Sequence, residues 1–394
     1  MVSGGTYGVE DIVHGAGYGR AILFLVLTPL LWSLPTAFMI GELSSALPCE
    51  GGYYAWVRRA MGNFWGFQEA WLSLTASIFD MAIYPTLFVA YLTRLFPWFS
   101  INHRGLMVAL TVVIVCAAKY GALFHAVTQP TTSKVDLIGG LLICMWNYMG
   151  WDNASTIATE VERPQRTYPR AMLMAVCIVA LSYIVPVAAV WMTGLPAGAW
   201  ETGSWADIAG LLGGPLLRVA LVVGGMFSAF GMFNALVMSY SRLPLAMAQD
   251  GMLPSIFGKL NRRRAPWVAI IALAIGWAAC LNLGFERLIT LDIFVYGLSL
   301  ALEFLALIVL RVREPNLARP FRVPGGLFGA VAVGVAPVLL LGFDLVRSQS
   351  EQVGGISSFA LGAAVIGAGV LAYVASHLVK PAGWATAGRP EPVA

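Results

Sequence analysis

The chain has 394 residues, of which 59% are hydrophobic and only 11% are charged. A soluble domain carries about 25% charged residues, whereas stretches of about 20 apolar residues recur along this whole chain. The composition therefore excludes a soluble multidomain protein and predicts one all-α integral membrane domain over residues 1–394. The net charge of +4 lies in loops between apolar stretches, so the expected surroundings are a lipid bilayer and no nucleic acid.

Ten apolar stretches are the predicted membrane spans. In chain order they are 18–46, 64–97, 105–127, 136–160, 170–194, 213–241, 266–284, 288–311, 326–346 and 356–379. Basic residues gather in four of the intervening loops, which the positive-inside rule places in the cytoplasm. These residues are Arg58, Arg59, Arg163, Arg166, Arg170, Lys259, Arg262, Arg263, Arg264, Arg311, Arg313, Arg319 and Arg322. We expect a multi-pass protein of the cell (inner) membrane, with a disordered tail over 381–394.

The predicted span 136–160 is interrupted in its middle by the polar and flexible segment from Asn147 to Asn153. Irregular backbone at that depth is tolerated only where it lines an enclosed cavity or contacts a ligand, because hydrocarbon cannot satisfy free N–H and C=O groups. Secondary transporters build their substrate sites from such broken helices. The interruption therefore predicts a substrate-binding segment.

Two predicted spans carry polar residues on one helical face. The first set is Glu69, Ser73, Ser77, Asp80 and Tyr84, and the second is Asp292, Tyr296, Ser299 and Glu303. Their spacing of three or four residues stacks each set along one face of a helix. Carboxylates inside a span normally face a cavity or a partner, so we interpret these faces as cavity-lining. The alternative for each residue is a structural hydrogen bond, or a position near the headgroups for Glu69.

Several motifs occur in an order that is more specific than any one of them. They are Ser3 to Asp11 (SGGTYGVED), 32–35 (WSLP), 50–57 (EGGYYAWV), 64–68 (FWGFQ), the interruption followed by 160–164 (EVERP), and 319–326 (RPFRVPGG). Together they resemble the amino acid/polyamine/organocation (APC) superfamily permeases over essentially the whole chain. The branch that the chain most resembles holds plant polyamine uptake transporters and related bacterial amino acid permeases.

The resemblance implies a five-plus-five inverted-repeat (LeuT-type) bundle. Residues 1–135 would form the first repeat, 136–312 the second and 326–379 two accessory spans. The first and sixth helices would unwind at Ser3–Gly8 and Asn147–Asn153. Amide groups after Gly5 would then bind a substrate carboxylate, and carbonyls near Asn147 to Gly150 an ammonium. The implied substrate-binding residues are Ser3, Gly4, Gly5, Thr6, Tyr7, Gly8, Asn147, Tyr148, Met149, Gly150, Trp151 and Asp152.

The implied function is secondary active transport of amino acids or polyamines by alternating access, with H⁺ as the coupling ion and neither cofactor nor metal. Candidates for a cavity or coupling role are Glu10, Asp80, Tyr84, Tyr296 and Glu303.

Some of these residues have a local alternative. Trp151 is either an aromatic lid over the substrate or a packing residue. Glu10 and Asp11 suit the first turn of a helix, and Asp152 and Asn153 suit an N-cap. The charge of the substrate therefore stays open.

The sequence departs from the family pattern in two places, so we expect about 10–11 spans instead of 12. Met1 lies two residues before Ser3, where relatives have a half-helix of about two to three turns. The stretch 119–134 is too short and too polar for the fifth span, and one further span is needed to place every basic cluster in the cytoplasm. In some relatives a lysine on the fifth helix takes the place of a bound cation, and this sequence has no residue that matches it. The alternative function is a transport-incompetent fragment or a substrate-binding sensor.

A membrane-embedded enzyme is disfavoured by the pattern of potential catalytic residues. The histidines are isolated at His14, His103, His125 and His377, and the sequence contains no HExxH or Gly-x-Ser-x-Gly motif. We therefore expect no enzymatic activity.

Overall fold

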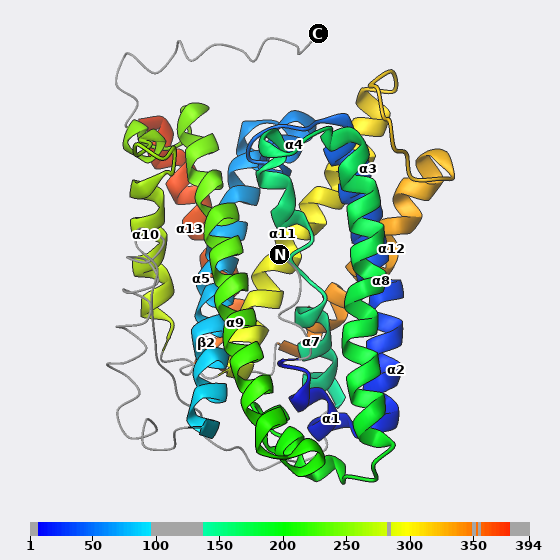
Figure 1. The fold of residues 1–394 in the computed structure, drawn as a ribbon. Coiled ribbons are helices and arrows are strands. Elements are labelled where there is room, and N and C mark those ends of the chain that lie inside the picture. The colour runs from blue at the N-terminus through cyan, green and yellow to red at the C-terminus, as the bar shows by residue number, and fades with distance from the viewer. Residues whose placement is uncertain (1–6, 96–136, 282–284, 349–351, 354–355, 379–394) are drawn as a thin grey trace.

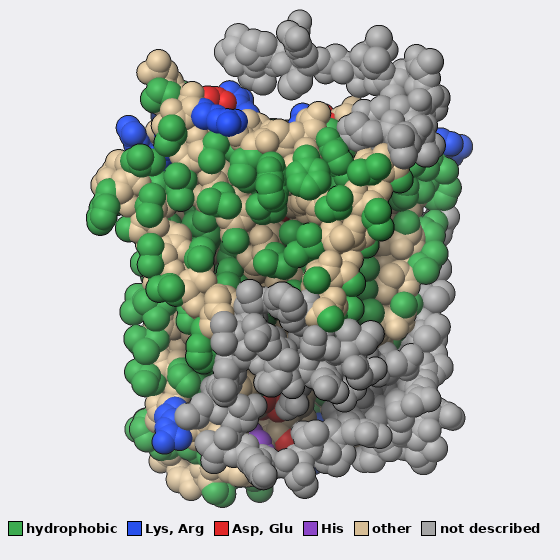
Figure 2. Space-filling model, turned by 180° about the vertical axis from the view of Figure 1, so that it is seen from behind, with side chains coloured by type: hydrophobic (Ala, Val, Ile, Leu, Met, Phe, Trp, Pro, Cys, Tyr) green, Lys and Arg blue, Asp and Glu red, His purple; other side chains and the backbone are tan. Residues whose placement is uncertain are grey.

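The structure is a computed structural model that describes residues 7–95, 137–281, 285–348, 352–353 and 356–378. Long helices lie side by side and form a bundle (Figure 1). Hydrophobic side chains cover much of the outer face seen in Figure 2. Among the described residues, Met192, Leu216 and Phe328 are largely exposed. An apolar outer face of this extent suits contact with lipid rather than water.

Within residues 7–95, the first half of the bundle contains two spans and the short helices α1 and α4. The elements are α1 (Glu10–Ala16), α2 (Tyr18–Thr28), a π-helical turn (Pro29–Ser33), α3 (Leu34–Ala46), α4 (Tyr53–Met61) and α5 (Asn63–Leu95). The π-helical turn begins at Pro29, whose missing N–H removes one α-helical hydrogen bond and so favours the wider turn. Helices α2 and α3 therefore act as one continuous span, Tyr18–Ala46.

The second half contains the broken helix and the remaining spans. The helices are α7 (Leu137–Asn147), α8 (Pro164–Trp191), α9 (Trp205–Gln249), α10 (Trp267–Ala279), α11 (Phe285–Arg313), α12 (Gly326–Ser348) and α13 (Ser358–Leu378). Short 3₁₀ turns cover Asp152–Thr156, Ala158–Glu160, Ala197–Ala199 and Ser255–Gly258. Strands β1 (Gln352–Val353) and β2 (Ile356–Ser357) form a small antiparallel pair.

Six helices of the described part are long and apolar enough to cross a membrane. They correspond to the predicted spans 18–46, 64–97, 170–194, 213–241, 288–311 and 326–346. The predicted spans 266–284 and 356–379 match shorter apolar helices, Trp267–Ala279 and Ala360–Ser376. The predicted span 105–127 and the predicted disordered tail 381–394 lie outside the described residues.

Helices α5 and α11 form the interior of the bundle. The most apolar part of α5 is 78% buried and that of α11 is 67% buried, whereas that of α12 is only 17% buried. The two helices pack on each other, and α5 also contacts α4, α9, α10 and α13. The two polar faces predicted from sequence therefore lie on the most enclosed helices of the bundle.

The basic loops meet at one end of the bundle. Arg58 forms an ion pair with Asp250, Arg59 with Glu314, and Arg313 donates to the Ala60 carbonyl at 2.9 Å. Figure 1 shows α4, the start of α8 and the loops after α9 and α11 at this same end. The positive-inside rule predicts that this end faces the cytoplasm, and on that prediction we call it the cytoplasmic end.

Candidate functional site

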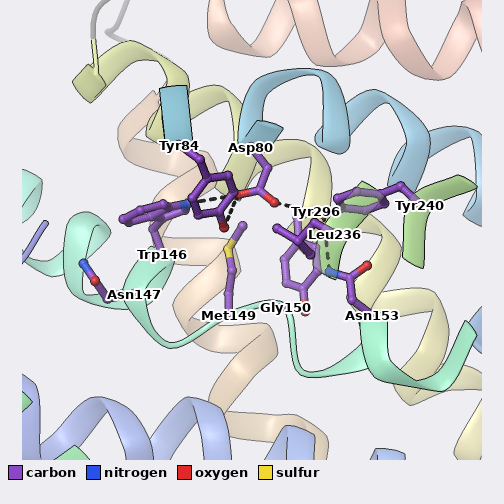
Figure 3. Close-up of a pocket in the computed structure, with 10 residues that line it drawn as sticks. All are labelled: Asp80, Tyr84, Trp146, Asn147, Met149, Gly150, Asn153, Leu236, Tyr240 and Tyr296. Atoms are coloured by element: carbon purple, nitrogen blue, oxygen red, sulfur yellow. Dashed lines mark hydrogen bonds between the residues drawn. The ribbon is translucent and has the colours of Figure 1, made fainter. Parts of the chain in front are cut away.

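The helix interruption predicted at Asn147 to Asn153 is present in the structure. Helix α7 ends at Asn147, Gly150 has φ 84°, and a 3₁₀ turn begins at Asp152. A positive φ at Gly150 is a conformation that side chains with a Cβ rarely adopt. Figure 3 shows the chain passing through this irregular segment beside α5 and α11.

The carbonyl groups freed by the interruption already have protein partners. The Tyr183 hydroxyl donates to the Asn147 carbonyl at 2.8 Å, and the Trp151 indole donates to the Tyr148 carbonyl at 2.6 Å. The hydroxyl of Ser33 lies 3.4 Å from the same Tyr148 carbonyl. These two carbonyls are therefore less available to an ammonium than the sequence suggested.

A cavity lies between this segment and helices α5, α9 and α11 (Figure 3). Its lining residues are Asp80, Tyr84, Trp146, Asn147, Met149, Gly150, Asn153, Leu236, Tyr240 and Tyr296. Apart from the carboxylate of Asp80, the polar groups of this lining are uncharged hydroxyl, amide and indole groups. The cavity therefore presents one negative charge surrounded by aromatic rings.

The carboxylate of Asp80 accepts hydrogen bonds from neutral groups of three described residues. The Tyr84 hydroxyl donates to Oδ1 at 3.1 Å, the Tyr240 hydroxyl to Oδ2 at 3.1 Å, and the Trp146 indole lies 3.4 Å from Oδ1. Asn153 in turn donates to the Tyr240 hydroxyl at 3.3 Å. Among the described residues, Asp80 has no ion pair with a basic side chain, although an ionised carboxylate in a membrane interior normally has such a partner.

A second hydrogen-bonded set joins the interrupted helix to α11. The Tyr296 hydroxyl donates to Asp152 Oδ1 at 2.5 Å and accepts from the Gly150 amide at 3.3 Å. The N-cap residue of the 3₁₀ turn is Trp151, and it makes no side-chain capping bond. The N-cap interpretation of Asp152 and Asn153 is therefore wrong, because both lie inside the turn and their side chains bind tyrosines of other helices.

The first predicted helix break is described only from Tyr7 onward, so the predicted residues Ser3, Gly4, Gly5 and Thr6 lie outside the described part. Gly8 has φ 93°, and Asn147 Nδ2 lies 3.4 Å from its carbonyl oxygen. This contact brings the two predicted breaks together.

Glu10 begins α1 as expected for a residue of the first turn. It is fully buried, accepts from the Gly8 amide at 2.6 Å, and is also bonded by the Tyr91 hydroxyl. Asp11 accepts from the Thr202 hydroxyl at 2.8 Å. Helix-end chemistry therefore accounts for part of the Glu10 environment, whereas its burial against Tyr91 was not predicted.

The structure separates the predicted site residues into two groups. Those that line the cavity are Asn147, Met149, Gly150, Asp80, Tyr84 and Tyr296. Those described outside its lining are Tyr7, Gly8, Tyr148, Trp151, Asp152, Glu10 and Glu303. The indole of Trp151 is buried and bonded to a carbonyl, which favours the packing interpretation over a lid in this conformation.

Sequence reasoning did not assign a site role to Trp146, Asn153, Leu236 or Tyr240. Tyr240 lies near the end of a predicted span and belongs to no polar face in the sequence, so its contact with Asp80 depends on how α9 packs against α5. Asn153 belonged to the interruption predicted to bind substrate, with an N-cap as its local alternative, but it was not among the individually named substrate-binding residues.

Three further carboxylates are buried on α5 and α11. Glu69 and Glu303 are 0% exposed and Asp292 is 1% exposed. Ser73 donates to Glu69 Oε1 at 2.9 Å, whereas the other Glu69 oxygen and both oxygens of Asp292 and Glu303 have no hydrogen-bond partner within the described part of the chain. Within the described residues, these groups lack the counter-charge that buried carboxylates usually have.

The EGG motif at 50–52 connects the cytoplasmic end to the segment after the helix interruption through a backbone hydrogen bond. The Gly51 amide donates to the Thr156 carbonyl at 3.2 Å, and a Cβ on Gly52 would lie 2.1 Å from Ser155 Oγ. Arg242 of α9 pairs with Glu50 at 3.6 Å and with Glu160. Burial raises the pKa of Glu50 above its ordinary value, and Arg242 acts in the opposite direction.

Comparison with known proteins identifies the family. A sequence model described as amino acid permease matches residues 1–129 and 106–371. The chain is 33% identical over 418 residues to probable polyamine transporter At3g19553 of Arabidopsis thaliana, covering 98% of this chain and 86% of that relative. It is 35% identical over 399 residues to polyamine transporter PUT1 of Oryza sativa subsp. japonica, covering 93% and 74%. It is 27% identical over 380 residues to the serine/threonine exchanger SteT of Bacillus subtilis (strain 168), covering 84% of each chain.

The chain therefore belongs to the amino acid permease family, and the predicted resemblance is confirmed. Together with its apolar helices, this membership makes it a multi-pass membrane protein of the transporter class. The alignment with At3g19553 covers 418 residues, more than the 394 of this chain. That relative consequently contains residues that have no counterpart here.

Proposed function

We propose that this protein is a proton-coupled permease that moves polyamines across the cell membrane by alternating access. The substrate would bind between the two helix breaks of a five-plus-five inverted-repeat bundle, with 1–135 and 136–312 as the repeats and 326–379 as accessory spans. The observation that carries the proposal is Asp80, a buried carboxylate that faces the cavity and has only neutral partners among the described residues. Relatives named as polyamine transporters support the same substrate class.

The chemistry of the cavity suits a protonated amine. An ammonium that enters can donate directly to Asp80, while the hydroxyls of Tyr84 and Tyr240 turn to accept from it. The rings of Tyr84 and Trp146 lie 6.3 Å apart between centroids and can contribute cation–π attraction of about 0.5–2 kcal/mol. An ammonium would thus replace neutral donors by a charge-assisted hydrogen bond.

Proton coupling is proposed because the same buried carboxylates can take up either a proton or an ammonium. Asp80 and Glu303 are the residues to which we assign this exchange, and Glu10, bonded to Tyr91, is a further candidate. The cavity would open alternately toward the two ends of the bundle. We assign a gating role to the ion pairs at these ends, which are Arg242 with Glu50 and Glu160 at one end and Arg94 with Asp207 at the other.

An amino acid substrate is the second candidate, favoured by the similarity to SteT. Such a substrate also needs donors for its carboxylate, and the resemblance assigns these to Ser3 to Thr6. Uptake that requires an α-carboxylate would favour this candidate over a polyamine.

The proposal also retains the prediction that a fifth span is missing. The two family-model matches overlap at 106–129, a range that includes most of the stretch 119–134 that is too short for a span. Helix α5 ends and α7 begins toward the same end of the bundle (Figure 1). An even number of membrane crossings between them would connect these two points, whereas the sequence predicts only the span 105–127 there. The alternative of a transport-incompetent fragment or sensor predicts binding without flux.

Uptake in proteoliposomes tests the proposal. Purified protein is reconstituted into proteoliposomes whose lumen is either acidic or neutral. Uptake of a labelled linear triamine is compared with uptake of a neutral amino acid. We expect triamine uptake that responds to the pH gradient and is lost in Asp80→Asn. Asp250→Asn is the matched control, because Asp250 pairs with Arg58 at the cytoplasmic end. Binding without uptake would favour the sensor, and normal triamine uptake by Asp80→Asn would refute the assigned site.

A further inference from the structure

The two polar faces of α5 and α11 meet in register. Ser73 Oγ of α5 lies 3.2 Å from Ser299 Oγ of α11, and Arg313 near the end of α11 reaches the Ala60 carbonyl just before α5. The helices are therefore antiparallel. Toward the cytoplasmic end, residue numbers fall along α5 and rise along α11. Glu69 then lies at the level of Glu303, and Asp80 at the level of Asp292.

Each helix carries its two acids eleven residues apart. Eleven residues make about three turns, so both acids lie on one face, separated by about 16 Å along the axis. We call Asp80 and Asp292 the cavity acidic layer, and Glu69 and Glu303 the cytoplasmic acidic layer. Between them, Tyr296 of α11 holds Asp152 at 2.5 Å, which adds a carboxylate at an intermediate level.

The cytoplasmic acidic layer contains more than acidic residues. The hydroxyl of Tyr53, from α4, is fully buried and has no hydrogen-bond partner among the described residues. Its electrostatic neighbours are Glu69, Asp152 and Glu303. A buried hydroxyl without a partner is unusual, because such groups are nearly always hydrogen-bonded in native proteins. Tyr53 therefore places its hydroxyl near the unpaired oxygens of the two glutamates, with the Ser73 hydroxyl also close to it.

The available groups favour an ammonium over a metal ion. The layer offers one free oxygen of Glu69, two of Glu303 and the phenolic oxygen of Tyr53, which suit the three N–H donors of a primary ammonium. The described residues contain no cluster of three or more His, Cys, Asp or Glu that could hold a metal ion. None of the described basic residues pairs with Glu69 or Glu303, so no cation in that part of the protein stabilises their ionised form.

We propose that the cytoplasmic acidic layer is a second ammonium-binding subsite, which makes the permease selective for long linear polyamines. This inference rests on the proposed function and extends it from substrate class to substrate length. A four-carbon diamine spans five bonds of about 1.5 Å and cannot connect layers about 16 Å apart. A linear tetraamine reaches both layers and passes Asp152 between them. Tyr296 must move from Asp152 to admit it, because the cavity lining does not extend to Glu69 or Glu303.

Equilibrium binding in detergent tests the subsite with two ligands, a four-carbon diamine and a linear tetraamine. The wild-type protein should bind the tetraamine more tightly. Glu303→Gln should weaken tetraamine binding by roughly 30-fold or more, as expected for loss of a buried charge partner, and leave diamine binding unchanged. Asp80→Asn should weaken binding of both ligands. Ser299→Ala is the matched control, since it alters the same region of α11 without removing a charge.

A thermal melt establishes that each variant is folded, and Glu69→Gln replaces Glu303→Gln if the latter is not. Equal effects of Glu303→Gln on both ligands, or no effect on either, would overturn the second subsite while the proposed function stands. A wild-type protein that binds neither amine would instead refute the proposed function itself. Diamine binding therefore distinguishes failure of the second subsite from failure of the proposed function.

Discussion

Glu42 and Glu303 are both 0% exposed, yet their surroundings differ completely. Glu42 accepts from Arg311 Nε at 2.9 Å and from the Val323 amide at 2.7 Å, and Arg319 lies 3.2 Å away. Glu303 lies only eight residues before Arg311 on α11 and has no partner among the described residues. A buried acid with its cation supplied by the chain holds the fold together, whereas Glu303 has no such cation among the described residues and is the acid that we propose binds an external ammonium.

The motif at 319–326 explains how Glu42 acquires its partners. Arg311 also donates to the Val323 carbonyl at 2.8 Å and to Gly326, so the loop after α11 closes over the ion pair. Glu42 itself belongs to α3. The loop thus connects α3, α11 and the start of α12, and the family motif here has a structural role.

The largest effect should come from Glu42→Gln. Breaking a buried ion pair leaves an arginine charge without its counter-charge and costs about 3–5 kcal/mol. We expect a lower thermal midpoint or failure to purify as a folded protein, whereas Glu303→Gln should melt at or above the wild-type temperature. Equal destabilisation by the two variants would remove the distinction between the two acids.

Asp80→Asn should affect binding more than stability. The tyrosine and indole donors of Asp80 are neutral and can still reach an amide oxygen, so the fold is retained. Loss of the charge should weaken polyamine binding by roughly 30-fold or more. Calorimetry measures the affinity, with Asp250→Asn as the control, and an unchanged affinity would show that the ammonium binds elsewhere.

A β-branched residue at Gly150 should disturb the cavity through its backbone. Gly150 has φ 84°, which is strained for valine by about 1–3 kcal/mol. Gly150→Val should lose ligand binding while still inserting into the membrane. Gly342→Val on α12 is the control, because a Cβ there meets no atom within 4 Å. Full affinity in Gly150→Val would contradict the role of the interruption, and the same substitution at Gly5 extends the test to the first break.

The smallest effect should come from the exposed pair of Arg59 and Glu314. The hydrogen bond from Arg59 holds the pKa of Glu314 below its ordinary value. A lowered pKa means that the pair stabilises the folded protein above the unfolded pKa of the carboxyl, and that this contribution disappears as the pH falls through the folded value. Glu314→Gln should cost at most about 1 kcal/mol at neutral pH, and less in melts below about pH 4.

The sequence predicted the spans of the described part well because apolar length alone indicates a membrane helix. It also located the interruption, since Asn147 and Gly150 break an otherwise apolar run, and it placed Asp80, Tyr84 and Tyr296 on polar faces. It could not predict which residues meet across helices. The contact of Tyr240 with Asp80, the register of α5 with α11, and the pairing of Glu42 with Arg311 all depend on helix packing that no local pattern encodes.

Thermal melting of the purified chain against a panel of amines and amino acids tests the central claim most directly, because a ligand that binds only the folded protein raises the midpoint. We predict that linear polyamines raise the midpoint of the wild-type protein, that neutral amino acids do not, and that Asp80→Asn abolishes the shift. Stabilisation by amino acids alone, or an equal polyamine shift in Asp80→Asn, would contradict the assignment of this cavity to a cationic amine.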